Sequence, residues 1–279
     1  MSLELTPEIL RKYDVAGPRY TSYPTAPEWS SEVSHEDYQL HLGKISDEDV
    51  SLYFHIPFCQ SLCTYCGCNV AIRKHWPKYG DEYIDYLEKE MIAVTENLKK
   101  KLTVQQLHWG GGTPTFLNLE QISRLFQLIE KYFNINFEGE LSIEIEPRTV
   151  DRDQLQLLRN LGFNRISMGV QDFDEKVQNA INRVHDFEKV KEIKEICDDL
   201  KFNSINLDLI YGLPFQTLEG YKETVKKVLL LKPDRVALYS FAHLPWLKSH
   251  HKKISEESLP NADEKLSIFL MASEAFSSG

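Results

Sequence analysis

The sequence lacks any long run of hydrophobic residues. No segment of the 279-residue chain approaches the roughly 20 uninterrupted apolar positions that a membrane-spanning helix needs. The opening stretch, MSLELTPEILRKYDV, places charges where the apolar part of a secretory signal peptide would stand. We therefore expect no membrane span, no signal peptide and a cytoplasmic location.

The sequence also lacks an excess of basic residues. It has 32 Lys and Arg against 42 Asp and Glu, a net charge of −10. Because nucleic acids and anionic membranes bind basic faces, this balance argues against both as partners. An anionic substrate would then have to be held by a local basic pocket.

Cysteines are few and unevenly placed. Four of the five lie in one loop, FHIPFCQSLCTYCGCNV (54–70): Cys59, Cys63, Cys66 and Cys68. A secreted disulfide framework would spread its cysteines along the chain, so this bunching favours metal or redox chemistry in a reducing compartment. The fifth, Cys197, stands in a helix-like segment and is interpreted as a buried structural thiol.

The cysteine spacing is C-x3-C-x2-C-x-C, and thiolates bind either zinc or iron–sulfur clusters. A structural zinc site usually takes two pairs of ligands from separate hairpins, and this sequence offers no second distant pair. Three cysteines in one loop can hold three irons of a [4Fe–4S] cluster and leave the fourth iron open. A zinc-stabilised α/β binding module without catalysis is the alternative.

Strand-like and helix-like segments alternate along the chain. Runs rich in β-forming residues lie at 51–56, 104–109, 140–145, 164–170, 204–210 and 235–241. Segments with apolar residues at helical spacing lie at 83–100, 119–133, 153–163, 190–202 and 218–231. This order predicts an α/β fold with parallel strands, either an open doubly wound sheet or a partial or complete (β/α) barrel.

Polar or glycine-rich residues lie at the carboxyl end of each predicted strand, where such folds bind ligands. They are the cysteine loop, GGGTPT (110–115), Glu144, Glu146, Pro147 and Arg148, Gln171 and Asp172, Asp208 with YGLP, and AHLP. Glycines let a backbone approach a ligand closely and leave N–H groups free to bind carboxylate or phosphate. This layout predicts one large ligand site.

The motif Cys59-x3-Cys63-x2-Cys66 after a first strand resembles the signature of radical S-adenosylmethionine (SAM) enzymes. More specifically, the sequence resembles the oxygen-independent coproporphyrinogen III oxidases through PRYTSYPT (18–25), FHIPFC, CGCN (66–69), LHWGGGTPT, SIEIEPR, MGVQDF, NLDLIYGLP and AHLP. The resemblance implies a partial (β/α)6 radical-SAM barrel over residues 49–279, preceded by an N-terminal extension, 1–48. Family members continue into a C-terminal, mainly helical domain, so we expect residues 1–279 alone to lack full activity.

The resemblance also implies cofactors and their ligands. Cys59, Cys63 and Cys66 would ligate a [4Fe–4S] cluster, whose open iron SAM chelates before it is cleaved to a 5′-deoxyadenosyl radical. Cys68 matches a family cysteine that is not a ligand and is either a structural thiol or a catalytic helper. Tyr53, Tyr65, Gly111 and Glu144 match residues around this SAM. Gly112, Thr113, Gln171, Arg183, Asp208 and Ala242 match residues around a second SAM.

Several of these matches suit their implied roles chemically. Asp208 could bind ribose hydroxyls, Arg183 could clamp a carboxylate bidentately, and the amides of the glycine loop could meet the methionyl end. Each also has a plain structural alternative. Tyr53 could be core packing, Arg183 a surface helix charge and Asp208 a buried cap, and only the surrounding motifs favour the functional interpretation.

The implied reaction is oxidative decarboxylation of two propionates of coproporphyrinogen III to vinyl groups, giving protoporphyrinogen IX in haem biosynthesis. Arg19 and the run KSHHKK (248–253) are candidates to bind the substrate carboxylates, although a solvated loop is the more expected interpretation of the run. We expect a monomer and an unidentified electron donor. The alternative within the superfamily is a haem-binding chaperone, but such relatives usually lack CGCN and the PRYTSYP segment.

Overall fold

The computed structural model describes residues 8–9, 12, 25, 28–45, 49–74 and 78–278. Six parallel strands form its main sheet, in the order β1-β4-β5-β6-β7-β8. They are β1 (Val50–Ile56), β4 (Thr103–Gly111), β5 (Asn134–Ile145), β6 (Arg165–Gln171), β7 (Ser204–Tyr211) and β8 (Arg235–Ser240). All six predicted strands are confirmed, and each pairs with its neighbour along the chain.

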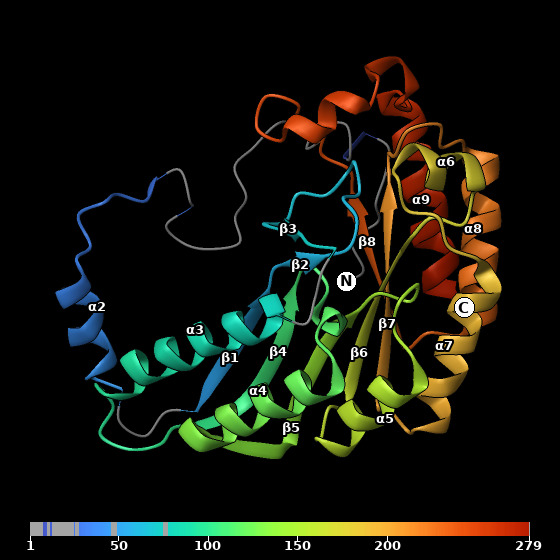
Figure 1. The fold of residues 1–279 in the computed structure, drawn as a ribbon. Helices are drawn as coiled ribbons and strands as arrows, with labels where there is room; N and C mark the ends of the chain where they lie inside the picture. Colours follow the sequence, from blue (N-terminus) through green and yellow to red (C-terminus); the bar gives the residue numbers. More distant parts are fainter. Residues whose placement is uncertain are drawn as a thin grey trace.

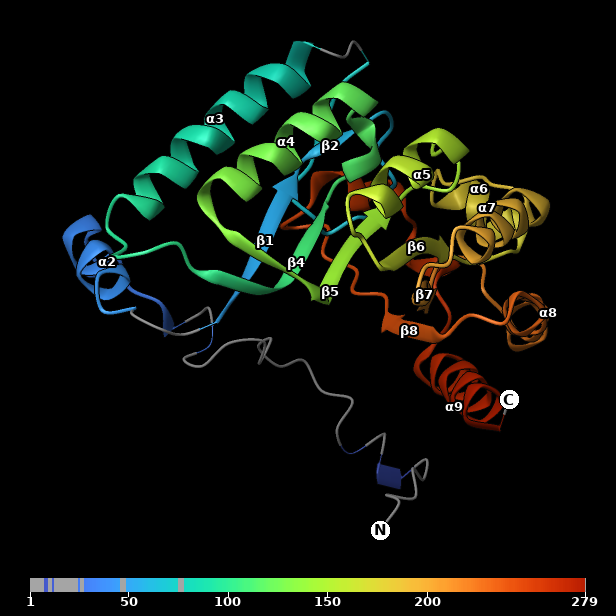
Figure 2. The ribbon, with the colours of Figure 1, turned by 90° about the horizontal axis from the view of Figure 1, so that it is seen from below.

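Helices follow the strands and cover one side of the sheet. The predicted helices are α3 (Lys78–Thr95), α4 (Leu119–Tyr132), α5 (Arg152–Asn160), α7 (Phe187–Asp199) and α8 (Leu218–Leu231). Three more lie outside the predicted ranges: α2 (His35–Leu42), α6 (Glu175–Ala180) and α9 (Ala262–Ser278). Figure 2 shows the sheet bent into an open arc with the helices on its outer side, which confirms the partial barrel.

The two faces of the sheet differ in polarity. In β4, Leu107 and Trp109 are fully buried in the core between sheet and helices, whereas His108 lies on the inner side of the arc. The helices follow the same division: α4 buries Ile122, Leu125 and other apolar residues. Since parallel sheets covered on both faces read as continuous apolar runs, this alternation marks an inner face that is open to polar groups.

The cysteine loop lies above the carboxyl ends of the strands. It begins with β2 (Phe58–Cys59) and returns through β3 (Ala71–Ile72), which pair as a separate two-stranded sheet. Figure 1 shows β2 and β3 at the upper end of β1 and β4, beneath the C-terminal segments. The loop therefore stands at the rim where α/β folds bind ligands.

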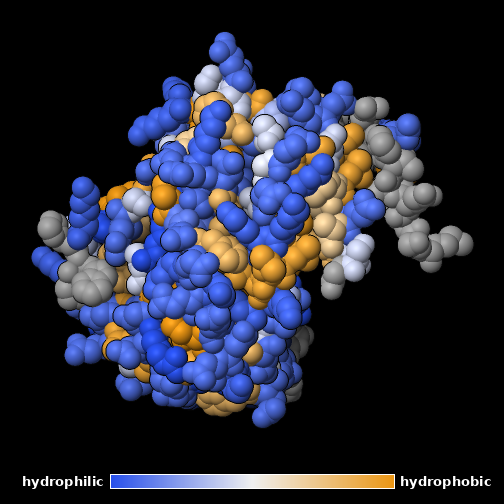
Figure 3. All heavy atoms as spheres, turned by 90° about the vertical axis from the view of Figure 1, so that its right-hand side faces the viewer, coloured by the Kyte–Doolittle hydropathy of each residue, from blue (hydrophilic) through white to orange (hydrophobic). Residues whose placement is uncertain are grey.

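The outer surface over the helices is mainly polar (Figure 3). The side of α7, α8 and α9 is mostly covered by hydrophilic side chains, with apolar residues gathered in narrower bands (Figure 3). Leu230 on α8 is one of the exposed apolar residues. Among the residues that the structure describes, no helix is long and apolar enough to cross a bilayer.

The predicted N-terminal extension, 1–48, lies largely outside the described residues; its described part includes α2. Helix α2 has a complete capping box, in which Ser34 and Asp37 satisfy each other's backbone N–H groups. Arg19, a predicted substrate contact, also lies outside the described residues. The division at residues 48 and 49 stays a prediction.

Candidate functional site

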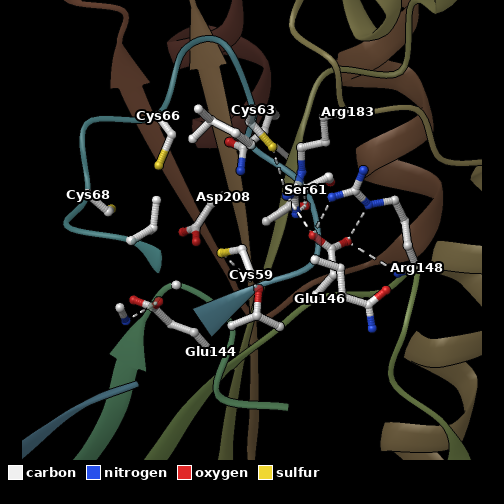
Figure 4. Close-up of a pocket in the computed structure, with 18 of the residues that line it drawn as sticks. Cys59, Ser61, Cys63, Cys66, Cys68, Glu144, Glu146, Arg148, Arg183 and Asp208 are labelled. Atoms are coloured by element: carbon white, nitrogen blue, oxygen red, sulfur yellow. Dashed lines mark hydrogen bonds and ion pairs between the residues drawn. The ribbon is translucent and has the colours of Figure 1, made fainter. Parts of the chain in front are cut away.

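A cavity of about 610 Å³ opens at the carboxyl ends of the strands (Figure 4). Most of the predicted site residues line it: Cys59, Cys63, Tyr65, Cys66, Cys68, Gly111, Gly112, Thr113, Glu144, Gln171, Arg183 and Asp208. Tyr53 lines a second cavity of about 430 Å³, which shares Glu144 and Asp208 with the first. Ala242 lines neither cavity.

The four thiols of the loop are free and lie on the wall of the cavity. Within the described part of the chain, no three His, Cys, Asp or Glu residues converge closely enough to hold a metal ion. In a [4Fe–4S] cluster each thiolate binds a different iron, and three cysteine thiols on one cavity are a donor set that fits such a cluster.

Cys66 and Cys68 lie close enough together for each thiol to change the pKa of the other. The Cys66 thiol donates a hydrogen bond to Cys68, which raises the pKa of Cys66 and lowers the pKa of Cys68 to about 7. Burial raises the pKa of Cys59, although the Thr113 hydroxyl, with its Oγ1 3.5 Å from the sulfur, acts in the opposite direction. The fourth cysteine is therefore adjacent to the predicted ligand set and not remote from it.

Hydrogen bonds from distant segments hold the first half of the cysteine loop. The Thr64 hydroxyl donates to the Ala180 carbonyl at 3.0 Å, at the end of α6. The Asn182 amide donates to the Leu62 carbonyl at 2.8 Å. Because these groups flank Cys63, the segment after β6 fixes the position of that thiol.

The run 248–253 contacts the second half of the loop. His250 donates from Nε2 to the Cys66 carbonyl at 2.7 Å. His251 is 1% exposed, and its ring stacks on His243 with centroids 6.0 Å apart. These two histidines pack inward, which differs from the expected solvated loop, while Lys248 lies close enough to influence the pKa of both Cys66 and Cys68.

The glycine loop passes directly beneath the cysteine segment. A Cβ atom at Gly112 would come 2.7 Å from the backbone of Pro57, and Gly111 has a φ of 118°. The Gly111 N–H donates to Glu144 Oε2 at 3.1 Å, and the Gly112 N–H donates to the Ile56 carbonyl at 2.8 Å. Both amides thus have protein partners, in contrast to the expectation that they are free for a ligand.

Two carboxylates face the cavity from strands β5 and β7. Asp208 accepts hydrogen bonds from Asn206 Nδ2 at 2.8 Å and from Ser167 Oγ at 3.1 Å. Burial raises the pKa of Asp208, while these hydrogen bonds oppose the rise. Glu144 also approaches His108 Nε2, at 3.5 Å. Both groups are placed to accept from ligand hydroxyls or ammonium groups.

Tyr53 is held on the inner face of β1. Its hydroxyl donates to His55 Nδ1 at 3.0 Å, and its ring stacks on His108 with centroids 5.7 Å apart. His55 in turn donates from Nε2 to the Asn69 carbonyl at 2.8 Å, in the CGCN segment. Burial is the main cause that raises the pKa of Tyr53 to about 12. The residue as a whole is 57% exposed, which argues against simple core packing.

Gln171 ends β6 and Asp172 follows it, and their side chains point in different directions. Gln171 has a φ of 68° beyond a register shift in the strand, and it lines the cavity. Its Oε1 atom is buried without a hydrogen-bond partner in the described structure, so it can accept from a ligand. Asp172, expected at the rim, is buried beside Gln216 and Thr224 instead.

Arg183 lies deep in the wall and forms an ion pair. Its Nη1 is 2.6 Å from Glu146 Oε2, and its Nη2 donates to the Gly169 carbonyl at 2.6 Å. Arg148 contacts the same carboxylate through Nε at 2.9 Å and Nη2 at 2.8 Å. The guanidinium of Arg183 is therefore neither a surface charge nor free to clamp a ligand carboxylate bidentately.

The ion pair of Arg183 and Glu146 is the feature that sequence reasoning missed. Burial acts to raise the pKa of Glu146, but the two guanidinium groups outweigh it and lower the pKa. Glu146 and Arg148 stand in SIEIEPR, where two charged residues directly follow a buried strand. That signal placed them at the rim without indicating their partner.

Comparisons with known proteins agree with the cysteine motif and with the parallel sheet. The model of the radical SAM superfamily matches residues 53–228. The oxygen-independent coproporphyrinogen III oxidase of Synechocystis sp. is 45% identical over 269 residues, which are 96% of this chain and 58% of that protein. The Escherichia coli protein of the same name is 44% identical over 260 residues, 93% of this chain and 56% of that protein.

A solved structure is also similar. The Escherichia coli coproporphyrinogen III oxidase (HemN), described as a radical SAM enzyme, superposes with a TM-score of 0.90 at 42% identity, covering 97% of this chain and 60% of that chain. The chain thus spans less than two thirds of the length of these relatives. Because the superfamily model covers more than half of the chain and the cysteine motif lies within the match, the chain belongs to the radical SAM superfamily.

Proposed function

We propose that the chain forms the barrel of an oxygen-independent coproporphyrinogen III oxidase, an oxidoreductase of haem biosynthesis. Its reaction would convert two propionates of coproporphyrinogen III to vinyl groups and give protoporphyrinogen IX. One observation carries the proposal: 44–45% identity to proteins of that name extends over 93–96% of this chain, with all four loop cysteines on one cavity.

Cys59, Cys63 and Cys66 would hold a [4Fe–4S] cluster, and SAM would bind its remaining iron. When bound, these two cofactors supply a carbon-centred radical that abstracts hydrogen from the substrate. The three thiols suit this role because they line the same cavity. Cys68 would not be a ligand; its sulfur beside Cys66 supports a role in the loop or near the substrate.

Two groups of residues would bind two SAM molecules. Tyr65, Gly111 and Glu144 lie on the same cavity as the cysteines, with Tyr53 in the adjoining space, and would surround the first. Gly112, Thr113, Gln171, Arg183 and Asp208 would surround the second. Asp208 and Gln171 offer acceptors to it, while Arg183 would act through its charge, since its donors have protein partners. Ala242 has no support from the cavity lining.

The substrate would bring carboxylates to the mouth of the cavity. Lys248 suits them, because its positive charge lies near enough to Cys66 and Cys68 to lower the pKa of both thiols. His250 is less suited, because it already donates a hydrogen bond to the Cys66 carbonyl.

We also propose that the protein is a monomer and works in the cytoplasm, where its five free thiols would stay reduced. Its electrons would come from a low-potential donor.

The test uses the chain reconstituted anaerobically with iron and sulfide. SAM, dithionite and coproporphyrinogen III are added, and 5′-deoxyadenosine and protoporphyrinogen IX are measured together. We expect the cluster to assemble and deoxyadenosine to form, with loss of both in Cys59→Ala. A bound zinc ion without sulfide would contradict the proposal. Because this chain spans only 56–58% of its relatives, the porphyrinogen assay is repeated with a chain of the relatives' full length, and deoxyadenosine without any change in the porphyrinogen there would move the substrate elsewhere.

A further inference from the structure

Three charged side chains pack together at the end of the cavity that holds Cys63 (Figure 4). The Glu146 carboxylate lies between Arg183, at 2.6 Å, and Arg148, at 2.8 Å. The side chains of Glu146, Arg183 and Arg148 are only 8%, 10% and 24% exposed. Such burial leaves little water to screen their charges. We call these three residues the arginine triad.

The arginine triad carries one uncompensated positive charge, because two guanidiniums share one carboxylate. A buried net charge is costly unless an opposite charge faces it. Arg183 directs its remaining contacts to the Gly169 carbonyl and to Cys63, with Nη1 3.8 Å from the sulfur. A single arginine would already neutralise Glu146, so Arg148 is an excess charge that a thiolate at Cys63 would balance.

The rest of the cavity is charged differently. Glu144 and Asp208 present carboxylates to the same cavity, and Figure 4 shows Glu144 on the side away from the arginine triad and Asp208 between the two. Lys248 acts on Cys66 and Cys68 but is not among the causes that perturb the groups around Cys63. Two further titratable side chains are buried near Arg183, and both are neutral at pH 7: burial raises the pKa of Tyr65 and lowers the pKa of His185 to about 4. The positive charge is thus local to one ligand thiol.

We propose that the arginine triad sets the reduction potential of the cluster, with Arg183 donating to the Cys63 sulfur. This inference rests on the proposed function. Reduction adds one electron from a low-potential one-electron reductant such as dithionite; no covalent bond forms or breaks, and the triad keeps its protons. A nearby positive charge and an N–H group on a ligand sulfur both stabilise the more negative reduced state and raise the potential.

Variants that change the charge of the triad in opposite directions test this proposal. Arg148→Gln makes the triad neutral, Glu146→Gln leaves two positive charges, and Arg148→Lys keeps the original charge. Arg152→Gln is the control, because it removes a charge from an exposed pair with Asp199 on the outer helices. Each protein is reconstituted anaerobically, checked for equal iron and sulfide content, and titrated with dithionite while the reduced cluster is followed by electron paramagnetic resonance.

We expect Arg148→Gln to lower the midpoint potential and Glu146→Gln to raise it. The expected size is about tenfold in the ratio of reduced to oxidised cluster at a fixed potential, or about 59 mV for one electron. Arg148→Lys and Arg152→Gln should titrate like the unaltered chain.

The opposite signs separate an effect of charge from structural damage. If both triad variants shift in the same direction, or if Arg148→Gln titrates like Arg152→Gln, the triad does not set the potential. Should Glu146→Gln fail to assemble a cluster, the contrast between Arg148→Gln and Arg148→Lys decides alone. Failure of the unaltered chain to bind iron and sulfide would instead overturn the proposed function, and this inference with it.

Discussion

The main sheet and the cysteine loop are held in place by different means. The sheet pairs all six strands along their length and packs fully buried side chains such as Leu107 and Trp109 against the outer helices. The cysteine loop contains only two strands of two residues each, β2 and β3, and its remaining described contacts include single hydrogen bonds from Thr64, Asn182 and His250. Stability should therefore reside in the sheet, and cofactor binding in the loop.

Removing a ligand thiol should give the largest change in cofactor binding and almost none in the fold. We expect Cys59→Ala or Cys63→Ala to lose the iron and sulfide of the reconstituted chain, because a cluster held by three thiolates cannot spare one. The far-ultraviolet circular dichroism spectrum should be unchanged. Cys197→Ala is the matched control: the thiol is buried in the core, so we expect full iron content and a loss of about 1 kcal/mol in unfolding free energy.

In the sheet, by contrast, we expect the largest change in the stability of the fold. Leu107→Ala leaves a cavity at a position with 0% exposure and should lower the free energy of unfolding by about 2–5 kcal/mol. Leu230→Ala makes the same change at a position that is 74% exposed, and should cost less than about 0.5 kcal/mol. Urea denaturation measures both; equal losses would mean that the core described here does not dominate stability.

The free energy of unfolding should depend on pH through His185, which contacts strand β6. His185 donates from Nε2 to the Val170 carbonyl at 2.8 Å, its Nδ1 is buried without a partner, and burial lowers its pKa from 6.5 to about 4. The unfolded chain therefore binds a proton first as the pH falls. Above pH 6.5 the protonation of His185 does not reduce the free energy of unfolding, and between pH 6.5 and about pH 4 this free energy falls progressively.

From His185 alone, the free energy of unfolding should fall by about 2 kcal/mol between pH 7 and pH 5. His185→Gln should flatten that part of the profile, and denaturation at several pH values measures the slope. An unchanged slope in the variant would assign the pH dependence to other groups.

The smallest effect is expected at the contact between His250 and the cysteine loop. His250→Ala removes one hydrogen bond, worth about 1 kcal/mol, and should speed the release of iron to a chelator roughly fivefold. His250→Asn, which keeps a donor, should partly restore the slower rate. His41→Ala, on the exposed surface of α2, is the control, and a similar acceleration there would deny His250 any specific role.

Sequence patterns predicted the sheet more fully than the polar contacts of the site. Runs of β-branched residues and helical spacing gave all six strands and five helices, because those signals are local. The cavity lining followed from residues placed after strands. The contact between His250 and Cys66 joins residues 184 positions apart, and no local pattern specifies such a pair.

Gln171 and Asp172 show why side-chain direction was harder to predict. The strand pattern placed both at the rim, but the register shift before Gln171 and its positive φ send the two neighbouring side chains to different sides. Arg183 was expected to bind a ligand and instead pairs with Glu146. Charge neutralisation inside the wall depends on tertiary contacts that the motif alone does not contain.

The most direct test of the central claim compares Cys66→Ser with Cys68→Ser after anaerobic reconstitution. The two thiols are neighbours on the same loop, but only Cys66 belongs to the proposed ligand set. We predict that Cys66→Ser loses iron and sulfide whereas Cys68→Ser retains both in the amounts of the unaltered chain. Equal loss in the two variants, or zinc bound in place of iron and sulfide, would contradict a cluster held by Cys59, Cys63 and Cys66.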